Sequence, residues 1–207
     1  ECESKLDYIN GPLCTICGRM LNDLDCSYII EDLCLDCVKW EENETWKGVL
    51  QKNRSVYHYN PFLKEFIARY KYRGDHALYQ FFTEDLRQIY RKEFKGNLLV
   101  PIPLSNERLY ERGFNQSEVL ARTIDEPLVA LKRSQHEEKQ SKKTRQDRLS
   151  RKDNPFILID GIQEKIKDAD ITIIDDIYTT GVTVRFAANL LLNNGAKSVS
   201  SLTVARG

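Results

Sequence analysis

The sequence predicts an α/β protein whose parallel sheet is flanked by helices on both faces and preceded by a small zinc-ribbon-like domain. From residue 55 onward, short β-branched runs alternate with amphipathic helical segments, which is the pattern of a parallel sheet. All six cysteines of the 207-residue chain lie in its first forty residues. We therefore expect a four-cysteine zinc-binding domain over residues 1–40, a linker over 41–54 and the sheet domain over 55–207.

Two cysteine pairs predict a structural zinc site. Sixteen residues separate the pairs, which fits the spacing of about 15–20 residues between the halves of a four-cysteine site. Four thiolates around one ion leave no open position for catalysis, and so short a segment needs the metal to fold. Two disulfides are the alternative, and Cys2 and Cys26 lack partners at ligand spacing. The expected ligands are Cys14, Cys17, Cys34 and Cys37.

Composition sets further limits on the kind of protein. The formal net charge is zero, so total charge indicates no class of partner. No apolar run is long enough to cross a membrane, and residues 1–10 lack the apolar core of a signal peptide. We expect a cytoplasmic protein without membrane insertion. Trp40 and Trp46 are expected to pack the cysteine unit against the sheet domain.

The first elements of the sheet domain have clear start and stop signals. A short strand is expected over residues 55–59. Asn60 then suits a helix N-cap and Pro61 the first helical position, and this helix stops near Gly74. A second helix, over about 75–94, places its leucines and aromatic residues on one face.

The second half of the domain alternates strands and helices. Residues 98–103 form a strand that ends in prolines, which cannot continue a ladder. A helix over 180–194 ends at Gly195 and is expected to turn a polar stripe containing Arg185 outward. The other strands are expected at residues 128–131, 156–159, 171–174 and 198–205.

Two adjacent carboxylates, Asp175 and Asp176, directly follow the apolar strand 171–174. Ligands of open parallel sheets bind beyond the carboxyl ends of the strands. The Thr/Gly loop that comes next offers hydroxyls and free N–H groups at a helix start, where phosphate binds well, and Gly181 allows close approach. Since carboxylates repel phosphate, they suit ribose hydroxyls or a divalent metal. The alternative is an ordinary strand–loop–helix junction with a Thr N-cap.

The residues DDIYTTGVT resemble the phosphoribosyl-pyrophosphate (PRPP) signature of type I phosphoribosyltransferases. The resemblance implies a fold of that type and a site for PRPP with Mg2+. It also implies that the acids hold the ribose hydroxyls, as catalytic candidates if the domain is active, and that the loop holds the 5′-phosphate. The residues implied are Asp175, Asp176, Thr179, Thr180, Gly181 and Thr183.

Arg108 and Arg112 are further candidates for PRPP binding. They stand four residues apart and share one side if their segment is helical. A guanidinium group can grip phosphate in a forked geometry. The alternative is a surface turn in which both arginines pair with Glu107 and Glu111.

Two basic segments are candidates for binding single-stranded DNA. Residues 69–73 interleave basic and aromatic side chains, and residues 132–152 are charged and almost free of apolar residues. The alternatives are an ordinary amphipathic helix end and a solvated, partly helical loop. The candidate residues are Arg69, Lys71, Tyr72, Arg73, Lys142, Lys143, Arg145 and Arg148.

Two more blocks, YKYRGD and VPIPLSNERLYERGFNQSEVLAR, resemble those of the ComF family, as do the four-cysteine unit and the PRPP motif. All four occur in the order of that family. The resemblance implies a role in natural transformation, in which single-stranded DNA enters the cytoplasm with a ComFA-type helicase as partner. An active phosphoribosyltransferase of nucleotide salvage or related metabolism is the alternative. No segment identifies an accepting base or an oligomeric state.

Overall fold

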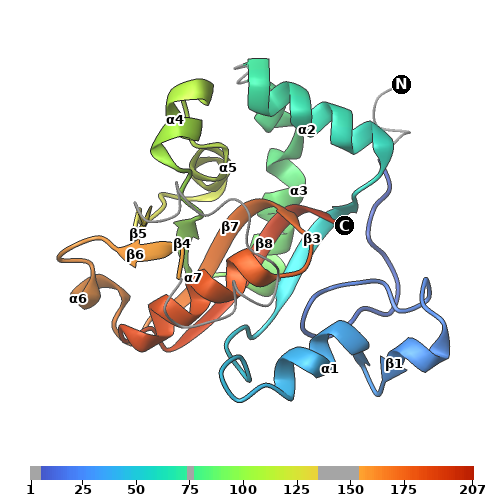
Figure 1. The fold of residues 1–207 in the computed structure, drawn as a ribbon. Helices are drawn as coiled ribbons and strands as arrows, with labels where there is room; N and C mark the ends of the chain where they lie inside the picture. Colours follow the sequence, from blue (N-terminus) through green and yellow to red (C-terminus); the bar gives the residue numbers. More distant parts are fainter. Residues whose placement is uncertain (1–5, 74–76, 135–153) are drawn as a thin grey trace.

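A four-stranded parallel sheet forms the centre of the computed structural model, which describes residues 6–73, 77–134 and 154–207 (Figure 1). All three strand pairings are parallel, so the carboxyl ends of the strands lie at one edge. This arrangement confirms the predicted α/β class. In spatial order the strands are β3 (Asn53–His58), β8 (Ser198–Arg206), β7 (Asp170–Tyr178) and β4 (Leu98–Pro101).

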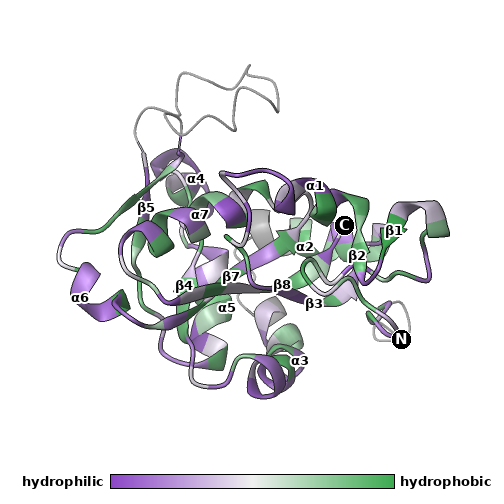
Figure 2. Cartoon of the chain, turned by 90° about the horizontal axis from the view of Figure 1, so that it is seen from below, coloured by the Kyte–Doolittle hydropathy of each residue, from purple (hydrophilic) through white to green (hydrophobic). Residues whose placement is uncertain are grey.

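Helices cover both faces of this sheet, as predicted. Figure 2 views the sheet from its edge, with α7 on one side and α3 and α5 on the other. Each face has its own apolar core, one shared with the four-cysteine unit and α7, the other with the remaining long helices. The helices are α7 (Val182–Asn193) on the first face and α2 (Pro61–Arg73), α3 (Ala77–Glu93) and α5 (Gln116–Ile124) on the second.

Helix α2 begins as its sequence predicts. Pro61 is its first residue, and the backbone N–H of Leu63 donates to the Asn60 side chain over 2.8 Å. Within the described residues, no helix combines the length and the apolar character needed to cross a bilayer.

The predicted strand at 128–131 is displaced. Leu128 donates its N–H to the Leu99 carbonyl over 2.8 Å, so this segment runs along β4 before a strand begins. The strand itself is β5 (Leu131–Arg133), which pairs antiparallel with β6 (Phe156–Leu158) in a separate ribbon. The short helices of this region are α4 (Asn106–Arg112) and α6 (Gln163–Ile166).

Strand β7 is longer than the predicted 171–174. It continues through both carboxylates because β8 goes on pairing with it, at Asp175 with Thr203 and at Tyr178 with Arg206. Asp175 and Asp176 therefore lie within the carboxyl-terminal part of β7, and the Thr/Gly loop begins after Tyr178.

Arg185 does not face solvent, contrary to the predicted polar stripe. Its side chain is fully buried, because the guanidinium stacks over the Trp40 ring at 4.4 Å and donates to the Tyr178 hydroxyl over 2.8 Å. The four-cysteine unit thus covers the part of α7 that was expected to be exposed.

The four-cysteine unit lies beside the β3 edge of the sheet (Figure 1). The Trp40 and Trp46 rings meet edge-on at 5.7 Å, and Trp46 meets Phe186 of α7 at 5.0 Å, which confirms their expected packing role. The division of the chain at residues 40 and 54 stays a prediction. The elements of the unit are a 3-10 turn (Cys26–Tyr28), β1 (Ile29–Ile30), β2 (Leu33–Cys34) and α1 (Leu35–Glu41).

Candidate functional site

The four predicted metal ligands come together in one buried cluster. Their sulfur atoms all lie within 4.8 Å of one another, and none of the four residues is more than 2 % exposed. Four soft thiol ligands in so small a space suit a zinc ion, and they could hold a metal in a closed site. The ligand set is Cys14, Cys17, Cys34 and Cys37.

Backbone geometry aims the thiols at a common centre. The Gly18 N–H donates to the Cys14 carbonyl over 2.9 Å, which closes the first turn, and the Cys34 N–H donates to the Cys14 sulfur over 3.5 Å. Gly18 has a φ of +67°, and a Cβ there would lie 2.8 Å from the Asn53 carbonyl oxygen. Only glycine fits, so the first turn is seated directly on β3.

A positive charge lies against this cluster. Arg206, the last residue of β8, donates from Nη2 to the Cys17 sulfur over 3.6 Å. Hydrogen bonds from Cys14, Cys34 and Cys37, together with the Arg206 charge, hold the pKa of Cys17 far below its usual value. A thiolate is the form that binds a metal.

The two carboxylates of the PRPP-like motif sit at the carboxyl edge of the sheet. Asp176 is 8 % exposed and Asp175 is half-buried. Burial and the adjacent Asp176 carboxylate raise the pKa of Asp175 to about 8. The Ser117 hydroxyl donates to Asp175 Oδ1 over 3.0 Å, and the Asp176 N–H donates to the same oxygen over 2.9 Å. A cation or a hydroxyl donor placed beside the Asp175 carboxyl group would therefore stabilise its ionised form.

The loop after β7 has the form expected of a phosphate cradle. Thr179, Thr180 and Thr183 are exposed, so their hydroxyls are accessible to a ligand. Gly181 forms the N-cap of α7 with a φ of +77°, and no side chain caps the helix start. The first-turn N–H groups consequently remain available for an anion.

Gly181 has a second structural role. A Cβ at this position would collide with the Tyr178 hydroxyl and with Nη1 of Arg185. The loop is therefore packed against two buried side chains, and glycine is required by this packing as well as by its left-handed conformation.

Arg108 and Arg112 lie on α4, which confirms that their segment is helical. Ser105 caps this helix by accepting from the Arg108 N–H over 3.3 Å, and Gly113 ends it with a φ of +76°. The segment follows β4, whose carboxyl end lies beside that of β7. Whether both arginines reach a ligand of the 179–183 loop stays a prediction.

Most of the side chains predicted to bind DNA lie outside the part of the chain that the structure describes. Arg69 is exposed on α2, and Lys71, Tyr72 and Arg73 belong to the last turn of that helix, with their side chains outside the described part. The remaining candidates, Lys142, Lys143, Arg145 and Arg148, lie outside the described residues.

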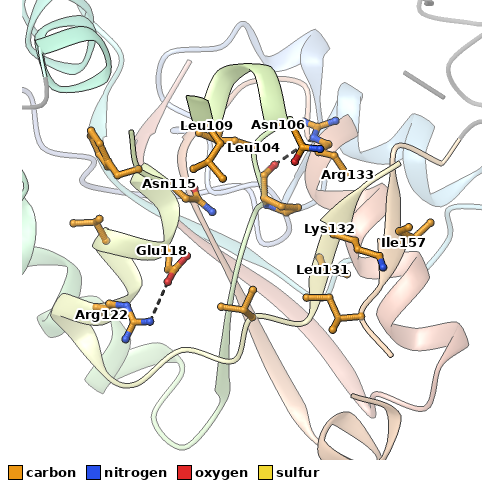
Figure 3. A pocket seen from close by; sticks show the side chains of 15 residues that line it. Leu104, Asn106, Leu109, Asn115, Glu118, Arg122, Leu131, Lys132, Arg133 and Ile157 are labelled. Carbon is orange, nitrogen blue, oxygen red and sulfur yellow. Dashed lines mark hydrogen bonds and ion pairs between the residues drawn. The ribbon is translucent and has the colours of Figure 1, made fainter. Parts of the chain in front are cut away.

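A cavity of about 740 Å³ opens between the α4–α5 region and the β5–β6 ribbon (Figure 3). The ion pair of Glu118 and Arg122, at 3.0 Å, lies on one side, and Lys132 and Arg133 lie on the other. Arg133 donates to the Pro103 carbonyl over 3.2 Å. The cavity has the size of a small-molecule pocket. Nothing in the sequence indicated a pocket at this place.

Three contacts of the site escaped the sequence analysis. Ser117 stands within the RGFNQS stretch, next to residues that were noted, but only the fold brings it to Asp175. Arg185 and Arg206 carry no sequence signal of burial, since arginine is usually exposed.

This chain is similar to proteins of known families. A family model described as a phosphoribosyl transferase domain matches residues 110–207. The competence protein ComFC of Bacillus subtilis is 40 % identical over the whole of this chain and 82 % of its own length. The chain belongs to the ComFC family. A second ComFC, from Streptococcus pneumoniae, is 34 % identical over the whole chain and 86 % of its own length.

A more distant relative matches about half of the chain. The DNA utilization protein YhgH of Salmonella typhi is 34 % identical over 49 % of this chain and 45 % of its own length. The predicted membership of the ComF group, the phosphoribosyltransferase-like fold and the four-cysteine unit are thus confirmed together.

Proposed function

We propose that this ComFC-family protein binds PRPP, or a closely related ribose phosphate, together with single-stranded DNA, and assists DNA uptake during natural transformation. The observation that carries the first part is the pairing of Asp175 and Asp176 with the uncapped helix start at Gly181, all at the carboxyl edge of one parallel sheet. The carboxylates suit the ribose hydroxyls with Mg2+, and the 179–183 loop suits the 5′-phosphate.

The DNA part of the proposal is supported by the relatives and by local charge. Two relatives that match the whole chain are competence proteins, and one that matches about half of it is a DNA utilization protein. Segment 69–73 carries basic and aromatic residues and segment 132–152 carries basic ones, which suit phosphate contacts and, in the first segment, base stacking. A ComFA-type helicase is the proposed partner, and zinc is the proposed ion of the four-cysteine site.

Thermal unfolding tests the PRPP site. Addition of Mg-PRPP is expected to raise the Tm of the wild-type protein, because a ligand that binds only the folded state stabilises it. The double variant Asp175→Asn, Asp176→Asn should lose this shift. Asp170→Asn is the matched control: it lies on the same strand but at its amino end, where it pairs with Lys197 at 2.9 Å. Absence of a shift in the wild type would refute the PRPP assignment.

Salt titration tests the DNA surface. Affinity for an oligo(dT) strand should fall steeply with salt, and Lys142→Gln, Lys143→Gln, Arg145→Gln together should lower the slope of log affinity against log salt by about two, since each contact to a single strand releases about 0.7 counterion. Removal of the same charge from Arg91, Lys92 and Lys95, beyond the amino end of β4, is the control. Equal slopes for both triple variants would contradict a DNA role for the 132–152 segment.

One observation favours the alternative, an active phosphoribosyltransferase. The cavity of about 740 Å³ beside β4 offers apolar walls and amide groups, as a site for an accepting base would. Catalysis would then consist mainly of positioning and charge stabilisation as pyrophosphate leaves. Release of pyrophosphate from PRPP only in the presence of a nitrogen base would support it.

A further inference from the structure

Two buried arginines lie between the four-cysteine cluster and the 179–183 loop. Arg206 is 4 % exposed; besides its contact with Cys17, it donates from Nη1 to the Tyr178 carbonyl over 3.5 Å. Its guanidinium carbon lies 5.0 Å from the centre of the Tyr178 ring. One side chain thus touches both a candidate metal ligand and the residue that opens the loop.

Arg185 reaches the same tyrosine from the other direction. It is fully buried, donates to the Tyr178 hydroxyl over 2.8 Å, and stacks on Trp40, which lies three residues after Cys37 on α1. Among the described residues, its Nε and Nη2 atoms and Nε of Arg206 have no hydrogen-bond partner. Both guanidinium groups are therefore buried cations with incomplete hydrogen bonding, which need a compensating negative charge nearby.

The four-cysteine cluster, which Arg206 contacts directly through Cys17, can supply that charge when a metal is bound. Four thiolates and one divalent ion carry a net charge of about −2, which balances two guanidinium groups. A bound metal would also fix the four sulfur atoms in place, including the Cys17 sulfur that Arg206 contacts. Metal binding at the cluster consequently favours the buried position of Arg185 and Arg206.

The same two arginines support the loop. Gly181 has no room for a Cβ because the Tyr178 hydroxyl and the Arg185 guanidinium fill that space. The backbone N–H of Arg185 donates to the Gly181 carbonyl over 3.0 Å, so this side chain projects from the first turn of α7 directly after the loop. Displacement of either arginine would therefore disturb the conformation of residues 178–184.

We propose that Arg185 and Arg206 are positioning residues that couple metal binding at the four cysteines to the conformation of the 179–183 loop. If the loop binds a ribose phosphate, as the proposed function holds, this coupling means that metal binding and ribose-phosphate binding strengthen each other. Coupling between two sites is reciprocal, so Mg-PRPP should slow the loss of metal as metal should favour Mg-PRPP.

Zinc release to a chromophoric chelator tests the charge balance. Arg185→Met and Arg206→Met are expected to release zinc about tenfold faster than the wild type, because the site loses a compensating cation. Arg185→Lys and Arg206→Lys keep the charge and should release zinc at nearly the wild-type rate. Arg87→Met is the control, since Arg87 is also partly buried and donates to a backbone carbonyl, that of Thr123, but belongs to the opposite face. Equal release rates for the Met variants and the wild type would overturn the proposal.

Hydrogen exchange of residues 178–184 tests the link to the loop without any ligand, so it is independent of whether PRPP binds. In zinc-loaded protein, all four Arg185 and Arg206 variants should exchange faster in this segment, because lysine lacks the forked donor geometry. Unchanged exchange in every variant would overturn the coupling. If exchange changes but Mg-PRPP neither binds nor slows zinc release in the wild type, the coupling stands and the PRPP assignment fails.

Discussion

At the scale of single residues, the site is organised around charges that the fold holds in unfavourable surroundings. Asp175 is a half-buried carboxyl next to a second one, and the Ser117 hydroxyl offsets only part of the cost of ionising it. A site of this kind gains when a ligand brings hydroxyl donors or a cation. The motif could be read from the sequence because its residues are consecutive, whereas Ser117 and Arg206 could not, because only folding brings them to it.

The pKa of Asp175 predicts how stability depends on pH. Its folded value of about 8 lies above its usual 3.8, so the folded chain holds the proton more tightly than the unfolded chain does. This contribution is complete below about pH 4 and is lost as the pH rises through 8. Scanning calorimetry at pH 5 and pH 8.5 should show a larger fall in Tm for the wild type than for Asp175→Asn. Parallel Tm profiles for the two proteins would contradict the assigned shift.

At the scale of elements, the alternation of strands and helices was predictable and the local pairing was not. The helix start at Asn60 and Pro61 carries its own signal in two adjacent residues. Strand β7 extends beyond its apolar run because β8 continues to pair with it. Residues 128–130 do not form the predicted strand, and Leu128 instead donates to the Leu99 carbonyl. Partner strands decide such boundaries, and the partners are distant in sequence.

The start of α7 gives a prediction with a close internal control. Gly181 and Gly113 have almost the same φ, +77° and +76°, but a Cβ would collide with Tyr178 and Arg185 only at Gly181. Both Gly→Ala variants should lose stability through backbone strain, and Gly181→Ala should lose about 1–3 kcal/mol more through overpacking. Each 1 kcal/mol corresponds to about 2–4 °C in Tm for a chain of this length. Equal Tm losses would show that the packing around Gly181 contributes nothing.

At the scale of the whole molecule, the four-cysteine unit and the sheet domain share one core. The four cysteines, both tryptophans and the inner face of α7 belong to a single buried cluster. Composition predicts two units, but nothing in the sequence indicates that Arg185 is covered by Trp40, since a polar position on an amphipathic helix is normally solvated.

Removal of the metal should therefore affect the entire chain. We expect about one zinc per chain, and chelation should lower the Tm of a single unfolding transition by at least several degrees, because metal binding supplies folding energy. Cys14→Ser should reproduce this loss, whereas Cys26→Ser, at an exposed cysteine outside the cluster, should not. Metal-free protein with an unchanged Tm would contradict the role of the cluster in stability.

The most direct test of the PRPP assignment is the 31P NMR spectrum of Mg-PRPP with increasing amounts of the zinc-loaded protein. The spectrum separates the 5′-phosphate from the diphosphate, and it also shows whether the diphosphate leaves the ribose. Binding in the 179–183 loop predicts that the 5′-phosphate resonance shifts or broadens with the wild type, but not with Asp175→Asn, Asp176→Asn, while the diphosphate stays attached. A 5′-phosphate resonance that does not respond to the wild-type protein would contradict the account.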